Sequence, residues 1–172
     1  MKKQNTVNIL FCGRGGQGVL AAAEICGWAA VLSGFHVKKS EVHGMSQRGG
    51  SVESHLRFGK EVFSPLIPKG EADIIVSFDG EEFARLKGFL KKDGIGLADG
   101  VNRGEKELKD QRRYLNVFVL GALSRHLLID EHRWLEAIEI VFAGKSPQKN
   151  KDVFLKGREH GAGTKEMRYD LE

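Results

Sequence analysis

The strongest constraint on the fold is a short apolar segment that runs into a cluster of glycines and continues as a helical pattern. Residues 7–11, VNILF, form an apolar run that stops at Gly13, as a buried parallel strand does. Apolar and small residues then recur at helical spacing from Val19 to Val31, and Gly34 is a natural helix stop. A second strand starts at Phe35. This strand–glycine loop–helix–strand unit predicts an α/β domain.

The middle of the chain predicts more strands, two of them antiparallel. The segment VESHLRF alternates apolar and polar residues, Gly59-Lys60 has the form of a two-residue turn, and EVFSPLIP returns from it. Pro65 and Pro68 restrict the returning strand to an edge of a sheet. We therefore expect an inserted antiparallel hairpin near residues 52–67. Residues 72–78 predict a buried central strand, followed by a helix over 81–90 and a strand over 95–98.

The last third of the chain predicts helices. Residues 116–129, NVFVLGALSRHLLI, are apolar nearly all round, which indicates a helix buried on most sides. Asp130 is suited to cap a following helix, and a last helix is expected over about 149–160. Residues 99–114 are polar and show no clear pattern. The predicted fold class is α/β: a three-layer Rossmann-like domain with a mostly parallel sheet, spanning 1–172 as one domain with a loose tail from about residue 161.

Composition narrows the class of protein. The chain has 172 residues, with 41% hydrophobic and 29% charged residues, as in an ordinary globular domain, and it has no apolar run long enough to span a membrane. Its net charge of +4 comes without the basic stripe and interleaved aromatic residues of a nucleic-acid-binding protein. Two isolated cysteines and scattered histidines predict no metal site. We expect a cytoplasmic protein that binds neither nucleic acid nor membrane.

The glycine loop, CGRGGQG, is the first candidate site. Gly13, Gly15 and Gly18 form a G-x-G-x-x-G pattern between a strand and a helix, where free N–H groups at the helix start attract an anion. A dinucleotide site also needs an acid at the end of the second strand, but that position carries two lysines and a serine before Glu41. Glycines that serve only helix–strand packing explain the pattern equally well. The candidate binding residues are Gly13, Gly15, Gly16, Gln17 and Gly18.

The second candidate site is the segment SEVHGMSQRGGSV, residues 40–52, which we interpret as a glycine-hinged loop. Glu41 and His43 are a candidate acid/base pair, and Arg48 is a candidate clamp for a phosphate or carboxylate. The alternative is a solvated surface loop, but the density of different functional groups favours a site. The remaining candidates, for contact with a partner or substrate, are Gly44, Met45, Ser46, Gln47, Gly49 and Gly50.

Several blocks together resemble the gamma subunit or domain of the 2-oxoacid:ferredoxin oxidoreductases. They are GRGGQGVLAAAEICGWAA, KKSEVHGMSQRGGSVESHLRFG, SPLIPKGEADIIVSFD, LNVFVLGAL and KNKDVFLKGREHG, and they cover nearly the whole chain in the right order. The small (beta) subunits of indolepyruvate:ferredoxin oxidoreductases resemble the chain most. SEVHGMSQRGGSV and SPLIPKGEAD are the specific blocks, whereas the longer tail after Gly161 departs from the usual pattern.

The resemblance implies an accessory subunit of an enzyme that oxidatively decarboxylates an aryl 2-oxoacid such as indolepyruvate. Coenzyme A takes the acyl group and ferredoxin takes the electrons. Thiamine diphosphate, magnesium and the iron–sulfur clusters belong to a large catalytic partner subunit, so the isolated chain is expected to be inactive and to hold no cofactor of its own. Two alternatives stay open: a stand-alone nucleotide- or coenzyme A-binding module, and a purely structural subunit.

Overall fold

The computed structural model describes residues 6–45, 49–109 and 111–161, which fold around a five-stranded sheet in the order β2-β3-β1-β4-β5. β4 and β5 run parallel to β1, whereas β3 is antiparallel to both β1 and β2. Four strands therefore point the same way, and the predicted mostly parallel sheet is confirmed. The strands are β1 (Val7–Arg14), β2 (His36–His43), β3 (Ser51–Gly59), β4 (Ala72–Ser77) and β5 (Leu90–Leu97).

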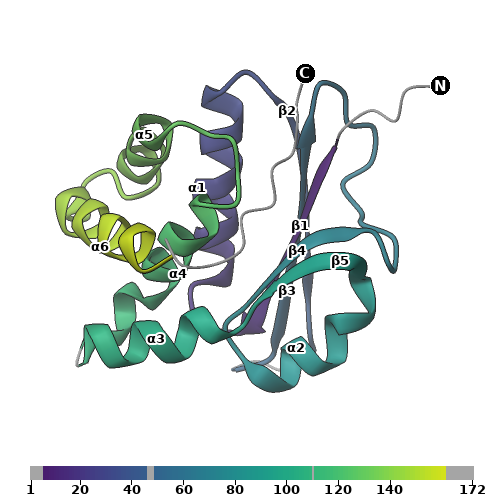
Figure 1. Cartoon of the computed structure of the whole chain (residues 1–172), viewed down its shortest axis with the longest axis horizontal. Helices are drawn as coiled ribbons and strands as arrows, with labels where there is room; N and C mark the ends of the chain where they lie inside the picture. The colour runs from purple at the N-terminus through teal and green to yellow at the C-terminus, as the bar shows by residue number, and fades with distance from the viewer. Residues whose placement is uncertain (1–5, 46–48, 110, 162–172) are drawn as a thin grey trace.

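Helices cover both faces of the sheet and make the three predicted layers. Figure 1 shows α1, α4, α5 and α6 on one side of the sheet and α2 on the other. The larger core joins α1, α4, α5 and α6 to one face of β1, β3 and β4, and a smaller core lies under α2. The helices are α1 (Val19–Leu32), α2 (Gly80–Leu86), α3 (Asp99–Leu108), α4 (Leu115–Ser124), α5 (Glu131–Val141) and α6 (Pro147–His160), with short 3-10 turns at Lys87–Phe89 and Arg112–Tyr114.

Most of the predicted elements are confirmed, and local chemistry explains their ends. Gly34, just after α1, has a φ of 86°, a conformation that favours glycine. The Asp79 carboxylate caps α2 by accepting hydrogen bonds from the N–H groups of Glu81 and Glu82, at 3.0 and 3.1 Å. α4 is buried nearly all round, as its apolar sequence predicts. Asp130 precedes α5 as expected, but its side chain makes no capping hydrogen bond.

The predicted antiparallel hairpin exists, but its position was wrong. β3 pairs with β2 through the 44–50 connection and not with residues 61–67, which form no strand. Side chains of β3 form hydrogen bonds with the main chain of residues 64–67, so these main-chain groups are not available for pairing with a strand. Arg57 Nη1 donates to the carbonyls of Ser64 and Leu66, and His55 Nδ1 accepts from the N–H of Ile67. The alternation predicted within β3 is confirmed, because Val52, Leu56 and Phe58 belong to the larger core.

α4 and α6 approach each other unusually closely. An ideal Cβ added to Gly157 of α6 would lie 1.9 Å from the carbonyl oxygen of Phe118, and one added to Gly121 of α4 would lie 2.2 Å from that of Phe154. These two glycines let the helix backbones touch, which fixes the position of α4 relative to α6. Asn116, at the start of α4, is positioned in this way.

Residues 99–114, unassigned from the sequence, contain α3 and the Arg112–Tyr114 turn.

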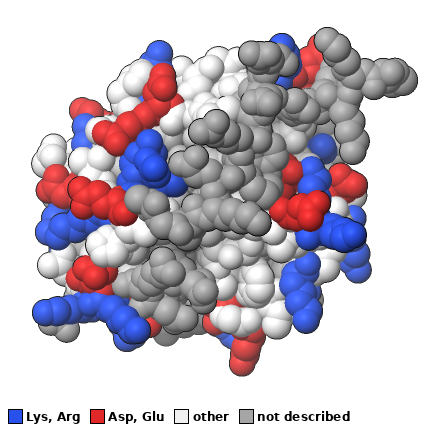
Figure 2. All heavy atoms as spheres, viewed as in Figure 1, with Lys and Arg blue, Asp and Glu red and all other residues white. Residues whose placement is uncertain are grey.

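Basic and acidic side chains are interspersed over the face of the molecule shown in Figure 2. Within the described ranges, no helix combines the length and the apolar character that crossing a membrane requires. The predicted loose tail lies largely in residues 162–172, outside the described part of the chain.

Candidate functional site

The two glycine-rich segments meet at one edge of the sheet. The N–H of Gly15 donates to the carbonyl of Gly50 at 2.9 Å, and a Cβ on Gly15 would lie 3.5 Å from the nitrogen of Gly49. The glycine loop follows β1, and the 44–50 connection follows β2, which points the same way as β1. The prediction that both segments lie at the carboxyl end of the sheet is confirmed. Binding crevices of open α/β sheets form at this edge.

The glycines of the first loop have different roles. A Cβ on Gly13 would lie 2.7 Å from Gln17 Oε1 and 3.1 Å from Phe78 Cβ, and one on Gly18 would lie 2.5 Å from Asn116 Nδ2. Gly13 and Gly18 therefore permit close packing, which the sequence left as an alternative to anion contact. Gly16 has a φ of 94° and nothing within 4 Å of its Cβ position. Among these glycines, Gly16 is the position where backbone can meet a ligand.

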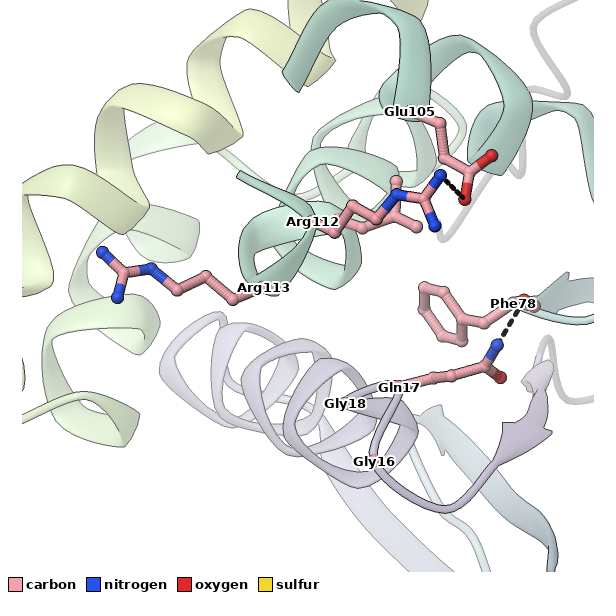
Figure 3. Close-up of a pocket in the computed structure, with 8 residues that line it drawn as sticks. Gly16, Gln17, Gly18, Phe78, Glu105, Arg112 and Arg113 are labelled. Atoms are coloured by element: carbon pink, nitrogen blue, oxygen red, sulfur yellow. Dashed lines mark hydrogen bonds and ion pairs between the residues drawn. The ribbon is translucent and has the colours of Figure 1, made fainter. Parts of the chain in front are cut away.

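Gln17, a candidate binding residue, uses its amide to brace the loop. Its Oε1 accepts from the N–H of Arg14 at 2.7 Å, and its Nε2 donates to the carbonyl of Phe78 at 3.0 Å (Figure 3). The amide thus ties the end of β1 to the end of β4. We conclude that Gln17 shapes the site, while one donor and one acceptor position of its amide remain beyond these two hydrogen bonds.

Arg14 and Asp79 form a second brace across the same two strand ends. Arg14 Nε lies 3.1 Å from Asp79 Oδ2, and its Nη2 also contacts Glu81. The pKa of Asp79 is lowered, first by the hydrogen bond from the N–H of Glu82 and then by the Arg14 guanidinium. Asp79 is therefore ionised at neutral pH, and its negative charge is compensated inside the protein.

A cavity of about 380 Å³ opens beside Gly16 and Gly18. Figure 3 shows its wall: Phe78 from the end of β4, Glu105 from α3, and two arginines from the turn before α4. Arg112 points toward Glu105, with 3.8 Å between Nη2 and Oε1, and its side chain is 74% exposed. Arg113 points the other way, and its guanidinium lies over the ring of Tyr114. Arg112 is thus weakly paired and largely exposed beside the glycine loop.

A second cavity, of about 410 Å³, lies on the other side of the glycine loop. It is lined by Arg14, His43, Val52, the first turn of α1 and the glycines at 15, 16 and 18. The first turn of α1 contains no acidic residue, so its N–H groups face the loop without a competing carboxylate. The glycine loop therefore separates two hollows, and both have a cation within reach.

Glu41 and His43 lie on a strand, contrary to our interpretation of residues 40–52 as a loop. β2 continues to His43, and both side chains point to the α1 face, 3.6 Å apart between Glu41 Oε2 and His43 Nε2. The sequence predicted the start of this strand but not its end, because KKSEVH is mostly polar, which an edge strand tolerates. Glu41 also pairs with Lys39 at 3.1 Å, so the acid serves two neighbours on one strand.

Only part of the 44–50 connection can be described. The N–H of Gly44 donates to the carbonyl of Ser51 at 2.7 Å, and Met45 is fully exposed. Gly49 has a φ of 63°, which favours glycine, and it lies against Gly15. The proposed anion contact of Arg48, and the proposed roles of Ser46 and Gln47, fall outside the described residues.

A polar cluster around the half-exposed Arg85, which the sequence did not reveal, anchors the base of this connection. Arg85 Nη2 contacts Glu53 Oε1 at 2.7 Å, Glu82 Oε2 at 2.6 Å and Ser51 Oγ at 2.6 Å. The pKa of Glu53 is lowered by its hydrogen bond with His55 and by Arg85. Ser51 is the first residue of β3, so the cluster ties the end of the connection to α2.

The cysteines do not suit an iron–sulfur cluster. Cys12 lies in β1 and Cys26 in α1, both fully buried. Burial raises the pKa of the Cys12 thiol to about 11 and also raises that of Cys26, so neither is the thiolate that iron requires. Within the described ranges, no group of three His, Cys, Asp or Glu side chains converges as metal ligands.

Arg112, Arg113 and Asn116 are the site residues that sequence reasoning missed. They lie about 100 positions from the glycine loop, and the contacts among α1, α4 and α6 bring them to it. The adjacent arginines just before a strongly apolar helix were an available signal. Without the topology, nothing linked them to Gly16.

The fold and this crevice define an α/β protein with a glycine loop at the carboxyl ends of parallel strands. The chain belongs to the pyruvate ferredoxin/flavodoxin oxidoreductase family, whose model matches residues 8–110. It is 50% identical over 88 residues to indolepyruvate oxidoreductase subunit IorB of Thermococcus kodakarensis, a match that covers 51% of this chain and 44% of that protein. The chain thus spans less than half of that relative's length.

Another relative matches over nearly its whole length. Pyruvate synthase subunit PorC of Methanothermobacter marburgensis is 31% identical over 173 residues, covering 86% of this chain and 93% of that protein. The resemblance to gamma subunits deduced from the sequence is confirmed by these relatives.

Two solved structures share the fold. A keto/oxoacid ferredoxin oxidoreductase gamma subunit from Geobacter sulfurreducens has a TM-score of 0.75 at 20% identity, covering 92% of this chain and 99% of that one. The 2-oxoglutarate:ferredoxin oxidoreductase from Magnetococcus marinus, solved with 2-oxoglutarate, coenzyme A and succinyl-CoA bound, has a TM-score of 0.78 at 22% identity. This match covers 96% of our chain but 32% of that one. The same fold therefore occurs both as a separate chain and as one part of a longer chain.

Proposed function

We propose that the chain is the accessory subunit of a thiamine-diphosphate-dependent 2-oxoacid:ferredoxin oxidoreductase, with indolepyruvate as the 2-oxoacid. The observation that carries the proposal is family membership combined with strong similarity to indolepyruvate oxidoreductase subunits. In the proposed reaction the complex oxidatively decarboxylates the 2-oxoacid, coenzyme A receives the acyl group, and ferredoxin receives the electrons. A large catalytic subunit supplies thiamine diphosphate, magnesium and iron–sulfur clusters.

The division of labour follows from the chemistry. Removing carbon dioxide from a 2-oxoacid leaves a carbanion equivalent, which thiamine diphosphate stabilises as an electron sink. The proposal assigns that group to the large subunit, because Asp79 and Glu53 already pair with arginines and no three His, Cys, Asp or Glu side chains of the described residues converge to hold its magnesium. The contribution of this chain is therefore to bind and position, and the catalytic step belongs to the partner.

The glycine loop is the proposed contact for the diphosphate of coenzyme A. Gly16 offers backbone in open space, the first turn of α1 supplies N–H groups, and Arg112 lies across the cavity from them. Arg48 would add a second cation from the 44–50 connection, while Glu41 and His43 would orient that connection or meet the partner. A charge-assisted contact of this kind contributes about 1.5–3 kcal/mol.

Kinetics of the reconstituted complex test the assignment. Arg48→Ala, Arg112→Ala and Gly16→Ala are compared with Arg133→Ala, a control arginine on α5 that pairs with Glu136. A higher KM for coenzyme A alone, with an unchanged KM for the 2-oxoacid, supports the diphosphate contact. Loss of subunit association without that change makes these loops an interface and favours the structural alternative. Unchanged kinetics and association would remove the site assignment.

Purification tests the subunit role itself. The full chain, tagged and expressed in its own organism, should co-purify with a large thiamine-dependent subunit in a fixed ratio. If the chain is recovered without it and binds coenzyme A by titration calorimetry, the stand-alone module is correct instead.

A further inference from the structure

In the part of the chain that the structure describes, the edge of the sheet formed by β2 is open. No strand other than β3 pairs with β2 in the described part of the chain, and none of the eight residues of β2 is buried. An open strand of this length is a template for pairing with another strand. Such edges are normally covered, shortened, interrupted or lined with charged side chains, and within the described residues β2 shows only the last of these features.

The hydrogen-bond pattern shows which residues present their main chain to this edge. The N–H of Gly44 donates to the carbonyl of Ser51, the residue directly opposite in the β2–β3 register. In an antiparallel pair, alternate residues point their N–H and C=O groups toward the partner strand. Gly44 and the even-numbered residues of β2 therefore bond to β3. The main-chain groups of the odd-numbered residues face outward: Val37, Lys39, Glu41 and His43.

We propose that β2 pairs with β2 of a second copy of this chain, antiparallel and centred on Ser40, so that the two sheets become continuous. This register places Lys39 opposite Glu41 of the second copy, and Glu41 opposite the second Lys39. Both residues have outward-facing main-chain groups, so each pair also carries ladder hydrogen bonds. The small Ser40 lies on the two-fold axis, opposite itself.

Charge selects this register over its neighbours. The two nearest alternative registers also place odd-numbered residues, whose main-chain groups face outward, opposite one another. They are centred on Lys39 or on Glu41, and each places two like charges directly opposite each other. Opposite charges across strands stabilise a pair, and like charges destabilise it. The lysines thus discourage other pairings and permit one self-complementary arrangement.

A second observation supports the same occupant. Trp28 and Val31 are exposed on α1, 38% and 46%, and lie on the same stripe of the helix as Glu24. Glu24 contacts Lys39 of β2, and Gly27 lies against Val37 and Leu56, which places this stripe above the open edge. Figure 1 shows α1 on the side of the sheet with the other packed helices. In the proposed dimer the two α1 helices share one face of the continuous sheet, so these apolar side chains gain a partner surface.

A cysteine placed on the axis tests the register. In a non-hydrogen-bonded antiparallel pair the Cα atoms lie about 4.5 Å apart, which suits a disulfide. Ser40→Cys should therefore give a covalent dimer under mild oxidation. Lys38→Cys is the control, because its position lies opposite Val42 and the two introduced thiols would be roughly 13 Å apart. The native cysteines are fully buried and should not contribute.

Self-association is measured on the full chain by sedimentation equilibrium. The unmodified chain should reach twice its single-chain mass of 19.1 kDa, and Glu41→Lys should raise the dissociation constant at least tenfold. Glu71→Lys makes the same charge change at an exposed position beside β4 and should leave it unchanged. A chain that stays monomeric at every concentration, or Lys38→Cys crosslinking as fast as Ser40→Cys, would overturn the proposal. Neither result depends on coenzyme A or on the large subunit.

Discussion

Substituting Gly18 tests whether the glycine loop is held by packing against α4. The φ of Gly18 is 78°, so an alanine there costs about 1–2 kcal/mol from the left-handed conformation alone. Its Cβ would also lie 2.5 Å from Asn116 Nδ2 and 2.8 Å from Asn116 Cγ, so the amide must move, which costs about 1–3 kcal/mol more. We expect Gly18→Ala to lower the free energy of unfolding by roughly 2–5 kcal/mol.

Gly16→Ala is the matched control, because its φ is 94° and its Cβ would meet nothing within 4 Å. It should cost only about 1–2 kcal/mol. Urea unfolding curves with equal slopes give both values. In a double-mutant cycle, Gly18→Ala together with Asn116→Ala should cost less than the sum of the single changes, since the overlapping amide is gone. If Gly18→Ala costs no more than Gly16→Ala, the packing role of Gly18 is wrong.

Three further expectations concern the cap, the thiols and the helix crossing. Asp79→Ala removes the cap of α2 and should cost about 1 kcal/mol at neutral pH. The pKa of Asp79 is lowered in the folded protein, so this stabilisation is present above the unfolded pKa of about 4 and is lost as the pH falls through the folded pKa. Plots of unfolding free energy against pH for the wild type and the variant should therefore converge in acid. The pKa of the Cys12 thiol is raised to about 11, and burial also raises that of Cys26, so neither thiol should react with a disulfide reagent at pH 8 until the protein unfolds. Rapid reaction of both thiols in native buffer would contradict their burial. Gly157→Ala forces a Cβ to within 1.9 Å of a carbonyl oxygen and should cost about 3 kcal/mol or more in thermal or urea unfolding, whereas Gly80→Ala, with open space around it, should be nearly neutral.

The parts of the fold with strong apolar patterns were predictable from the sequence. β1, α1, β4 and α4 are marked by apolar runs or helical spacing because they are buried on most sides. β2 was not predictable to its full length, since an edge strand buries little and the two valines of HVKKSEVH do not alternate with its polar residues. The same reason explains the misplaced hairpin: the second half of β2, from Ser40, was assigned to a loop, so the partner of β3 was sought on its C-terminal side.

The candidate site was predictable in its first half. The glycine pattern located the loop, but it could not separate glycines that pack from the one that faces open space. That distinction depends on Asn116 and Phe78, which reach the loop from distant parts of the chain. Arg112 lies nearby for the same topological reason, so no local spacing could have identified it.

The most direct test of the account is turnover of a reconstituted complex. The chain alone, supplied with thiamine diphosphate, indolepyruvate and coenzyme A, should reduce no electron acceptor, because the proposal assigns the thiamine site that stabilises the carbanion to the large subunit. The large thiamine-dependent subunit together with the chain should turn over, and omission of the chain should abolish or sharply reduce the rate. Activity of the chain alone, or an unchanged rate from the large subunit without it, would contradict its role as an accessory subunit.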